Sequence, residues 1–297
     1  MKIQNDINGW IVVDKPYQTG STDVVRLIKK TLHPKKIGHA GTLDPLATGV
    51  LPLALGKATR TIEFVMDGQK RYEFTVRFGK QTSTDDAEGE VIATSHKIPT
   101  KEEIEKVIPS FIGDVDQMPP AYSALKVDGK RAYELVRKGQ MPDLKSRKIR
   151  IDSLKFLGFE NETDAMFEVE CGKGTYVRCI GRDLALALGS VGYLTRLRRT
   201  KCAVFDIKNT ITLEKIKDLC YNNISDVLVP VKAVLTDILE LAINGQQARA
   251  LSQGQSLPLV GFKDLKEGAL YQATFDGELI AFVKVEGGKI RPSKVFI

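Results

Sequence analysis

The sequence contains few of the residues that build metal centres and disulfide frameworks. Among 297 residues there are four cysteines and three histidines, and no two cysteines form a Cys-x-x-Cys pair. Zinc sites and disulfide scaffolds need closely spaced sulfur or imidazole groups. The sequence therefore predicts a protein that has no metal site and keeps its thiols reduced, as in the cytoplasm.

Long apolar segments are also missing. An uncharged stretch at residues 46–56 contains Pro52 and two glycines, and it is too short to cross a bilayer. The first residues lack the apolar core and small-residue cleavage site of a secretory signal. We expect neither membrane insertion nor secretion, and the cytoplasm is the predicted location.

The common nucleotide-binding and hydrolase motifs are absent too. The Gly-Lys-Gly-Thr segment at residues 172–175 does not have the Gly-x4-Gly-Lys-Ser/Thr spacing of a phosphate-binding loop. No Gly-x-Gly-x-x-Gly follows a predicted strand, and no Gly-x-Ser-x-Gly nucleophile elbow occurs. ATP, NAD and serine-hydrolase chemistry are disfavoured, and we expect no cofactor.

The charge of the chain is uneven. The net charge is +7 and the pI is about 9.1, yet residues 236–297 carry seven basic and seven acidic side chains. The whole excess therefore lies in residues 1–235, which suggests a polyanionic partner for that region. A soluble basic surface without a partner explains the charge equally well, so charge alone leaves both interpretations open.

Apolar periodicity predicts an α+β fold with a mixed, mainly antiparallel central sheet and flanking helices. Residues 38–56 combine glycines with two prolines and predict a loop around short elements. A helix that begins after Ser21 or Thr22 as N-cap precedes them. The further predicted strands are 9–14, 71–78, 89–93, 148–156 and 165–171, and the further predicted helices are 101–111, 131–138, 177–188 and 213–219.

The C-terminal residues have a different pattern. A short helix at residues 243–252 precedes three predicted strands at 270–275, 279–285 and 289–295. Asp-Gly and Gly-Gly pairs separate these strands, as in tight hairpins. We therefore predict two domains, residues 1–235 and residues 236–297, the second small and rich in β-structure.

The densest motif of the chain lies at residues 38–52. It places a single acid, Asp44, in a glycine-containing loop between apolar flanks. Glycines let a ligand approach the backbone closely, and Pro45 restricts the chain just after the acid. An Asp-Pro pair is also common in plain turns, so the pattern alone favours a turn.

Residues 38–49 resemble the catalytic motif of the TruB family of tRNA pseudouridine synthases, Gly-His-x-Gly-x-Leu-Asp-Pro-x-Ala-x-Gly. The similarity is dense over residues 9–200 and looser beyond them. Other segments similar to this family occur in the expected order, at residues 14–16, 70–72, 84–89, 119–126, 129–133, 173–178 and 194–199.

The resemblance implies a pseudouridine synthase fold with a small PUA-like RNA-binding domain at residues 236–297. It implies an isomerase that converts uridine 55, in the T-loop of tRNA, to pseudouridine by base flipping. The T-arm of tRNA would be the partner. We expect a monomer that needs neither a cofactor nor an obligate protein partner.

The resemblance also assigns roles to individual residues. Asp44 corresponds to the catalytic aspartate, Tyr72 to a tyrosine that stacks on the target base, and Arg178 to an arginine that pairs with the aspartate. The plain alternatives are an inward strand aromatic for Tyr72 and a solvated helix-start charge for Arg178. The other residues predicted at the substrate site are His39 near the RNA loop, Tyr176, Leu197, Asp86 and Lys15, the last with a mainly architectural role.

The chemistry of this isomerisation is consistent with a single carboxylate. The C–N glycosidic bond breaks, the uracil turns and a C–C bond forms, without a change in redox state. A carboxylate can act as nucleophile or base, and either role requires it to be ionised. Arg178 within about 4–6 Å would favour the ionised form. Whether Asp44 attacks the base, attacks the sugar or removes a sugar proton stays open.

Two other functions remain possible from the sequence. A tRNA-binding chaperone could use the same fold without catalysis. A sugar-cleaving hydrolase could use Asp85 and Asp86 as an acid pair, although we expect both to lie in a solvated polar turn. Whether the protein is a synthase or a chaperone, four basic clusters are predicted to follow the tRNA backbone. They are residues 35–36, 126–131, 145–150 and 196–201.

Overall fold

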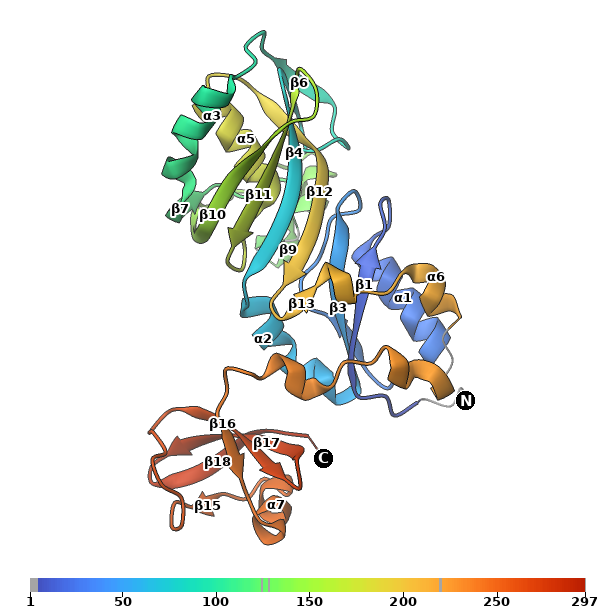
Figure 1. The fold of residues 1–297 in the computed structure, drawn as a ribbon, viewed down its shortest axis with the longest axis vertical. Coiled ribbons are helices and arrows are strands. Elements are labelled where there is room, and N and C mark those ends of the chain that lie inside the picture. Colours follow the sequence, from blue (N-terminus) through green and yellow to red (C-terminus); the bar gives the residue numbers. More distant parts are fainter. Residues whose placement is uncertain (1–4, 124, 128, 219–220, 297) are drawn as a thin grey trace.

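The computed structural model describes residues 5–296, except residues 124, 128, 219 and 220. Ala124 of the segment 119–126, Leu219 at the end of a predicted helix and Cys220 thus lie outside the described residues. The molecule is elongated, with a long central sheet and a separate C-terminal sheet at one end (Figure 1). Within the described chain, no helix is long and apolar enough to cross a membrane.

The central sheet has nine strands among the described residues. They are β1 (Gly9–Lys15), β2 (Ile37–His39), β3 (Thr48–Leu55), β4 (Lys70–Phe78), β7 (Gly113–Gln117), β10 (Arg147–Phe159), β11 (Asp164–Cys171), β12 (Gly192–Cys202) and β13 (Phe205–Asp206). Neighbouring strands follow the order β1-β3-β12-β4-β11-β10-β7, with β2 beside β3 and β13 beside β12. The pairs are antiparallel except β12 and β3, which run parallel. The predicted mixed, mainly antiparallel sheet is confirmed.

Helices pack on both faces of this sheet. The α-helices of this region are α1 (Ser21–Leu32), α2 (Ile62–Asp67), α3 (Lys101–Val107), α5 (Val177–Ala187) and α6 (Leu213–Lys217). The 3-10 helices are η1 (Gly56–Thr61), η2 (Ile108–Phe111), η3 (Ile207–Asn209), η4 (Tyr221–Asp226) and η5 (Val231–Val234). α3 and α5 pack over β4, β10 and β11, whereas α1 and α6 pack beside β1 and β3 (Figure 1).

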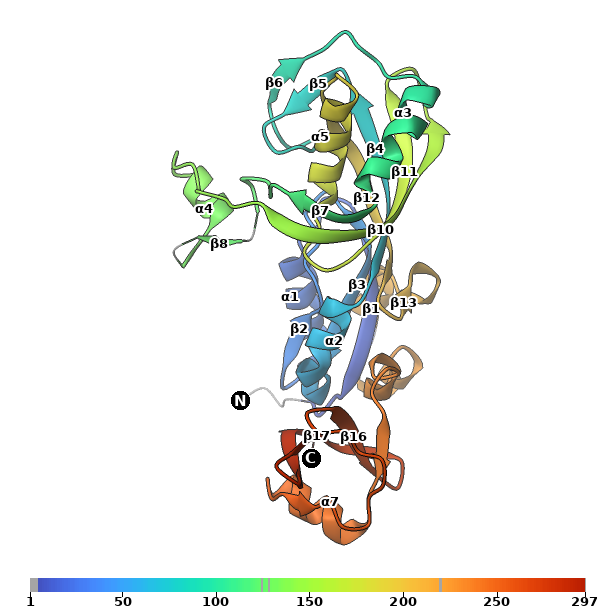
Figure 2. The same ribbon diagram turned by 90° about the vertical axis from the view of Figure 1, so that its left-hand side faces the viewer.

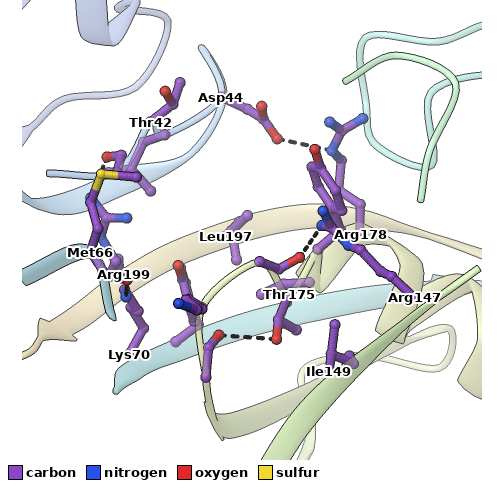
Figure 3. A pocket seen from close by; sticks show the side chains of 18 of the residues that line it. Thr42, Asp44, Met66, Lys70, Arg147, Ile149, Thr175, Arg178, Leu197 and Arg199 are labelled. Carbon is purple, nitrogen blue, oxygen red and sulfur yellow. Dashed lines mark hydrogen bonds and ion pairs between the residues drawn. The ribbon is translucent and has the colours of Figure 1, made fainter. Parts of the chain in front are cut away.

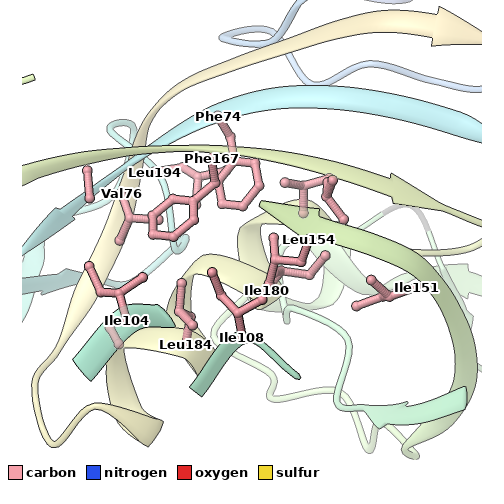
Figure 4. Close-up of a cluster of buried hydrophobic side chains, with 14 of the residues drawn as sticks. Phe74, Val76, Ile104, Ile108, Ile151, Leu154, Phe167, Ile180, Leu184 and Leu194 are labelled. Atoms are coloured by element: carbon pink, nitrogen blue, oxygen red, sulfur yellow. The ribbon is translucent and has the colours of Figure 1, made fainter. Parts of the chain in front are cut away.

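The main core lies between the long strands and the helices α3 and α5 (Figure 4). Side chains alternate along a strand, so Phe74 and its neighbours two residues away on β4 face the helices. The Phe74 and Phe167 rings stack with centroids 5.3 Å apart. Ile180 and Leu184 of α5 close the cluster from below, and their burial removes apolar surface from water.

The start of α1 differs from the prediction that Ser21 or Thr22 is the N-cap. Gly20 is the N-cap, and its N–H donates to the Asp23 carboxylate at 3.2 Å. Ser21 is the first helical residue, and its hydroxyl is used by a different partner, the backbone of Leu43. The Asp23 carboxylate thus accepts the N–H of the N-cap residue, and no hydroxyl side chain caps the helix.

A small arm projects from the body beside β7 and β10 (Figure 2). It contains β8 (Lys126–Val127), β9 (Lys130–Arg131) and α4 (Ala132–Val136), so the predicted helix at residues 131–138 is present but shorter. A second hairpin pairs β5 (Lys80–Thr82) with β6 (Val91–Thr94). The strand predicted at residues 89–93 corresponds to β6, whereas its partner β5 was not predicted.

The C-terminal domain is a five-stranded β-rich unit among the described residues. Its strands β14 (Glu240–Ala242), β15 (Leu257–Pro258), β16 (Leu270–Phe275), β17 (Glu278–Glu286) and β18 (Lys289–Val295) have the order β14-β16-β17-β18-β15. Helix α7 (Gly245–Ser252) packs against them. The positive φ angles of Asp276 and Gly277 form one of the predicted tight turns.

Aromatic side chains join the C-terminal domain to the rest of the molecule. Phe282 of β17 contacts Phe64 of α2 and Phe296, with ring centroids 5.2 and 5.0 Å away. The Lys294 ammonium lies 2.6 Å from the Glu63 carboxylate beside them. This contact buries apolar surface from both units in a shared cluster, while the predicted boundary after residue 235 stays a prediction.

The short strands β2 and β13 of the central sheet were not predicted, and neither were three strands of its main order, β3, β7 and β12. β12, at the centre of the sheet, contains four basic residues and lacks clear apolar alternation. β7 is short and polar. β3 lies in the region predicted as a loop, because its glycine and proline suggested irregular backbone although seven of its eight residues are buried. In all three cases tertiary pairing outweighs the local pattern.

Candidate active site

Asp44 lies in a short loop that leads from β2 to β3. Two buried side chains hold this loop from behind. The Ser21 hydroxyl donates to the Leu43 carbonyl at 2.8 Å and accepts from the Leu43 N–H at 2.9 Å. The Lys15 ammonium donates to the Pro45 carbonyl at 3.1 Å. The backbone is therefore fixed on both sides of Asp44.

Lys15 is a fully buried lysine whose ammonium group is surrounded by carbonyl oxygens. Nζ also donates to the carbonyls of Pro16 at 3.1 Å and Thr19 at 2.6 Å. Burial lowers the pKa of Lys15 to about 8, and the charge of Asp44 opposes this shift. Lys15 was predicted at the substrate site, but the structure places it behind the loop, where it anchors the backbone next to Asp44.

Arg178, the second residue of α5, brings a buried positive charge to Asp44. Its Nε lies 2.9 Å from Asp44 Oδ2, an ion-pair distance, although the N–H is not aligned as in a hydrogen bond. Nη1 donates to the Thr84 carbonyl at 2.7 Å and Nη2 to the Tyr122 carbonyl at 2.9 Å. These bonds fix the planar guanidinium. The structure thus brings Arg178 and Asp44 together, as the sequence predicts.

Asp86 is a second acid beside the same guanidinium. Its Oδ2 lies 3.6 Å from Arg178 Nη1, and its Oδ1 accepts from the Thr84 hydroxyl and the Glu88 N–H. Burial acts to lower the pKa of Arg178, but the charges of Asp44 and Asp86 outweigh it and the pKa is raised. The guanidinium therefore stays charged between two carboxylates, and the negative charge of Asp86 helps to keep it so.

The expectation that Asp85 and Asp86 lie in a solvated turn is wrong, because both are buried. Asp85 forms an ion pair with Arg182 of α5 at 3.1 Å. Each acid is thus committed to an arginine, which removes the motivation for a hydrolase acid pair. In the described part of the chain, no cluster of three His, Cys, Asp or Glu is placed to hold a metal ion.

Tyr72 stands on the helix-covered face of β4. In the strand register it lies opposite Arg199 on β12 and Val169 on β11. Burial raises the pKa of Tyr72 to about 12, while the charge of Arg199 opposes the shift. The side chain is therefore a protonated phenol at neutral pH, with an uncharged ring that is suited to stacking.

A cavity of about 640 Å³ brings these side chains together (Figure 3). Asp44 and Arg178 face one another on one side, while Met66, Lys70 and Arg199 lie on the other. The Asp44 side chain is 38% exposed, so a ligand can reach it. The sequence-predicted site residues that line the cavity are Asp44, Tyr72, Tyr176, Arg178 and Leu197.

Two family models match adjoining parts of this chain. Residues 29–177 match the family model of the TruB family pseudouridylate synthase N-terminal domain, and residues 178–236 match that of the tRNA pseudouridylate synthase B C-terminal domain. The chain is 42% identical over 299 residues to tRNA pseudouridine synthase B of Nitrobacter winogradskyi, which covers 99% of this chain and 84% of the relative. It is 44% identical to the Caulobacter sp. strain K31 protein of the same name, over 98% of this chain and 96% of that relative.

The chain belongs to the TruB family of tRNA pseudouridine synthases. It is accordingly an isomerase with the fold that the sequence resemblance implied. Among solved structures, an H/ACA ribonucleoprotein bound to a substrate RNA containing 2′-deoxyuridine superposes with a TM-score of 0.74 and 25% identity, over 97% of this chain and 85% of that chain. A Cbf5-Nop10-Gar1 complex gives a TM-score of 0.72 and 26% identity, with the same coverage.

In this TruB chain, Tyr176 forms the wall of the cavity beside Arg178. Gln117 of β7 holds its backbone, because the amide donates to the Tyr176 carbonyl at 3.0 Å and accepts from its N–H at 2.9 Å. The Arg147 guanidinium lies over the Tyr176 ring, 4.8 Å from its centroid. Arg147 and Gln117 were not singled out from the sequence, although Arg147 belongs to the predicted basic cluster 145–150.

A basic lobe of the cavity was also missed. Lys70 is almost fully buried, and its ammonium donates to the carbonyls of Met66 and Gly68. Lys173 lies 2.9 Å from the Asp67 carboxylate at the rim. Lys70 opens one of the segments that resemble the TruB family, and this position was the available signal for its place at the site.

His39 lies on β2 and does not line the cavity. Its Nδ1 is buried without a hydrogen-bond partner, and burial lowers its pKa. The charges of Arg199 and Arg131 act in the same direction, so the imidazole is neutral at pH 7. The predicted contact of His39 with the RNA loop stays a prediction.

The basic cluster at residues 196–201 does not form a continuous exposed surface, and its contact with the tRNA backbone stays a prediction. Arg198 forms two hydrogen bonds with the Asp14 carboxylate, at 2.8 and 3.1 Å. Arg199 is buried and binds backbone carbonyls. The reason is the strand itself, because β12 turns consecutive side chains to opposite faces of the sheet.

Proposed function

We propose that this protein isomerises uridine 55 in the T-loop of tRNA to pseudouridine. In that reaction the C1′–N1 bond breaks and a C1′–C5 bond forms, while C5 loses a proton and N1 gains one. The product is an isomer of the substrate, so the reaction needs no oxidant, reductant or co-reactant. The observation that carries the proposal is the pairing of Asp44 with a buried Arg178 beside Tyr72 in one cavity.

The Asp44 carboxylate is the reactive group of the proposal. Arg178 holds it and favours its charged form, as either nucleophilic or basic catalysis requires. The contact also orients the carboxylate, because the guanidinium is itself fixed by two carbonyls. Attack on the base, attack on C1′ and removal of a sugar proton all remain compatible with this geometry.

The target base has to leave its stack to meet Asp44. The carboxylate lies in a concave cavity, and a base that is stacked within a folded RNA loop does not enter such a cavity. Flipping the base out costs a few kcal/mol. Stacking on the Tyr72 ring would return about 1–3 kcal/mol of that cost. The proposal therefore includes base flipping, with Tyr72 as the stacking platform.

The tRNA backbone would be held around this cavity. The positive excess lies in residues 1–235, and Lys130 and Arg131 are exposed on the projecting arm. Arg147 and Lys173 line the cavity itself. We propose that residues 236–297 form a PUA-like domain that extends the RNA contact; this unit is neutral, so shape and polar contacts would dominate there.

The test uses an unmodified tRNA transcript and maps pseudouridine by position. The wild-type protein should form pseudouridine at position 55. Asp44→Asn should lower the single-turnover rate by on the order of 10⁴-fold or more, because it removes the reactive carboxylate while keeping its shape. The tRNA Kd of this variant should stay within about threefold.

The matched control is Asp114→Asn, which makes the same change at an exposed residue of the edge strand β7. It should keep the wild-type rate. A wild-type protein that binds tRNA but forms no pseudouridine would favour the chaperone function. Pseudouridine at another position would contradict the T-loop assignment, and an active Asp44→Asn variant would contradict the mechanism.

A further inference from the structure

Arg199 of β12 is a charged side chain that the proposed function leaves unexplained. It is 1% exposed and lines the inner wall of the cavity. Taking a guanidinium out of water is costly unless its donors and its charge are satisfied. The contacts of Arg199 therefore indicate what this buried charge does.

The Arg199 guanidinium joins the two ends of the segment that carries Asp44. Nε donates to the Val50 carbonyl at 2.7 Å, and Nη2 donates to the Gly41 carbonyl at 3.1 Å. These two residues bracket Asp44 in the chain. Because the guanidinium is planar and rigid, it sets the separation of the two carbonyls.

The backbone of Arg199 supports the same segment. Arg199 pairs in register with Gly49 of β3, at the junction where β12 and β3 run parallel. Gly49 has a φ of +101°, and a Cβ at this position would lie 2.2 Å from the Arg199 carbonyl oxygen. The exit of the Asp44 loop is thus packed directly against the strand residue whose side chain holds it.

The other neighbour of Arg199 is Tyr72. The two residues are directly opposite one another in the antiparallel register of β12 and β4. Facing residues in a ladder have Cβ atoms about 4.5–5.5 Å apart. Arg199 therefore contacts both structures that bring reactive groups to the cavity, namely the Asp44 loop and the strand of Tyr72.

Arg199 differs from the other side chains that anchor the loop. Ser21 binds Leu43 and Lys15 binds the Pro45 carbonyl, both from behind. Of these three anchors, Arg199 is the one that lines the cavity, on the side opposite Arg178 (Figure 3). Its position links the loop to the substrate side of the sheet.

We infer that Arg199 is a positioning residue that fixes the Asp44 carboxylate relative to the Tyr72 ring. The inference rests on the proposed isomerase function. The guanidinium spans the Gly41 and Val50 carbonyls and packs beside Tyr72, so it holds the distance between carboxylate and stacked base. Misplacement by about 1 Å can cost a factor of about 100 in rate without a loss of binding.

The test compares Arg199→Met and Arg199→Lys with the control Arg71→Met. Arg71 lies on β4 beside Tyr72, but it points to the opposite face and binds Glu170. Arg199→Met should lower the single-turnover rate on tRNA by about 100-fold, with the Kd within about threefold. Arg199→Lys keeps the charge but cannot span both carbonyls, so it should recover part of the rate. Arg71→Met should keep the wild-type rate.

A double-mutant cycle with Tyr72→Phe separates positioning from mere support of the fold. If Arg199 acts through the loop and Tyr72 together, the effects of Arg199→Lys and Tyr72→Phe will not add. Additive effects would overturn the inference, as would a folded Arg199→Met variant with a rate within threefold of wild type. Equal losses of rate, binding and Tm in both Arg199 variants would also overturn it. An inactive wild-type protein would instead contradict the proposed function itself.

Discussion

The two faces of the central sheet use arginine in opposite ways. On the outer face, Arg71 binds Glu170 and Arg77 binds Asp164, in cross-strand pairs whose arginines remain partly exposed. On the cavity side, Arg178 and Arg199 are buried and donate to backbone carbonyls, and those of Arg199 lie at the two ends of the Asp44 loop. The outer arginines are held by acids, whereas the inner ones also hold backbone in place, and Arg178 pairs with Asp44 and Asp86 in addition.

The difference follows from solvation. A partly exposed ion pair such as Arg71–Glu170 is screened by water and salt, so it adds little to stability. A buried guanidinium has lost its water, and its position is decided by the groups that replace that water. We therefore expect the inner arginines to control the rate of reaction and the outer ones to affect stability alone.

The largest effect in this comparison should come from Arg178→Ala. The change leaves Asp44 and the buried Asp86 without their counter-charge and removes the group that holds the Asp44 carboxylate. The single-turnover rate should fall by about 10³-fold, as when a preorganised charged donor is removed from a site. The tRNA Kd should change by less than about fivefold. A rate loss below tenfold would show that the inner face does not control the reaction.

A medium effect, on stability, should come from Arg77→Gln. Asp164 is 4% exposed, and its hydrogen bonds from Arg77 hold its pKa below the ordinary value. A carboxyl with a lowered pKa stabilises the fold above its unfolded pKa and loses this contribution as the pH falls through the folded value. Arg77→Gln should lower the free energy of unfolding at pH 7 by about 1–3 kcal/mol, with an unchanged rate.

Denaturant unfolding at pH 7 and at pH 3 checks this sign. The difference between wild type and Arg77→Gln should be largest at pH 7 and smaller at pH 3, where the Asp164 carboxyl gains protons. A difference that grows towards low pH would contradict the assignment of the pair. A fall in single-turnover rate at unchanged Tm would contradict the separation of the two faces.

The smallest effect should come from Arg71→Met, the same variant that serves as the control for Arg199. Arg71 and Glu170 form a partly exposed pair whose Nε–Oε1 distance is 2.7 Å. Its loss should cost at most about 1 kcal/mol in the free energy of unfolding. The rate should stay within about twofold of wild type. A tenfold loss of rate would contradict the contrast between the outer and the cavity-side arginines.

Local sequence patterns identified several parts of this protein correctly. The alternation on β4 predicted the face of Tyr72 and Phe74, and the hairpin turns of the C-terminal domain were also confirmed. These features depend on residues close together in the chain. The motif at residues 38–49 similarly indicated the family, because twelve consecutive residues carry that information, and the role of Asp44 stays a prediction.

Other features depended on contacts between distant residues. β12 did not look like a central strand, since arginines and a lysine interrupt its apolar alternation. Asp85 and Asp86 looked solvated, yet α5 supplies an arginine to each of them. In both cases a charge is stabilised by a partner far away in the sequence, which periodicity does not register.

The sequence by itself determined the family and the class of fold, because a contiguous motif and local periodicity encode them, and the same motif led to the proposal of Asp44 as the reactive acid. The tertiary structure alone decided the environment of each charge. Arg198 and Arg199 are adjacent and chemically identical, yet one binds an acid on the outer face and the other holds the Asp44 loop. The physical reason is that a strand alternates its side chains, while the solvation of each face is set by whatever packs against it.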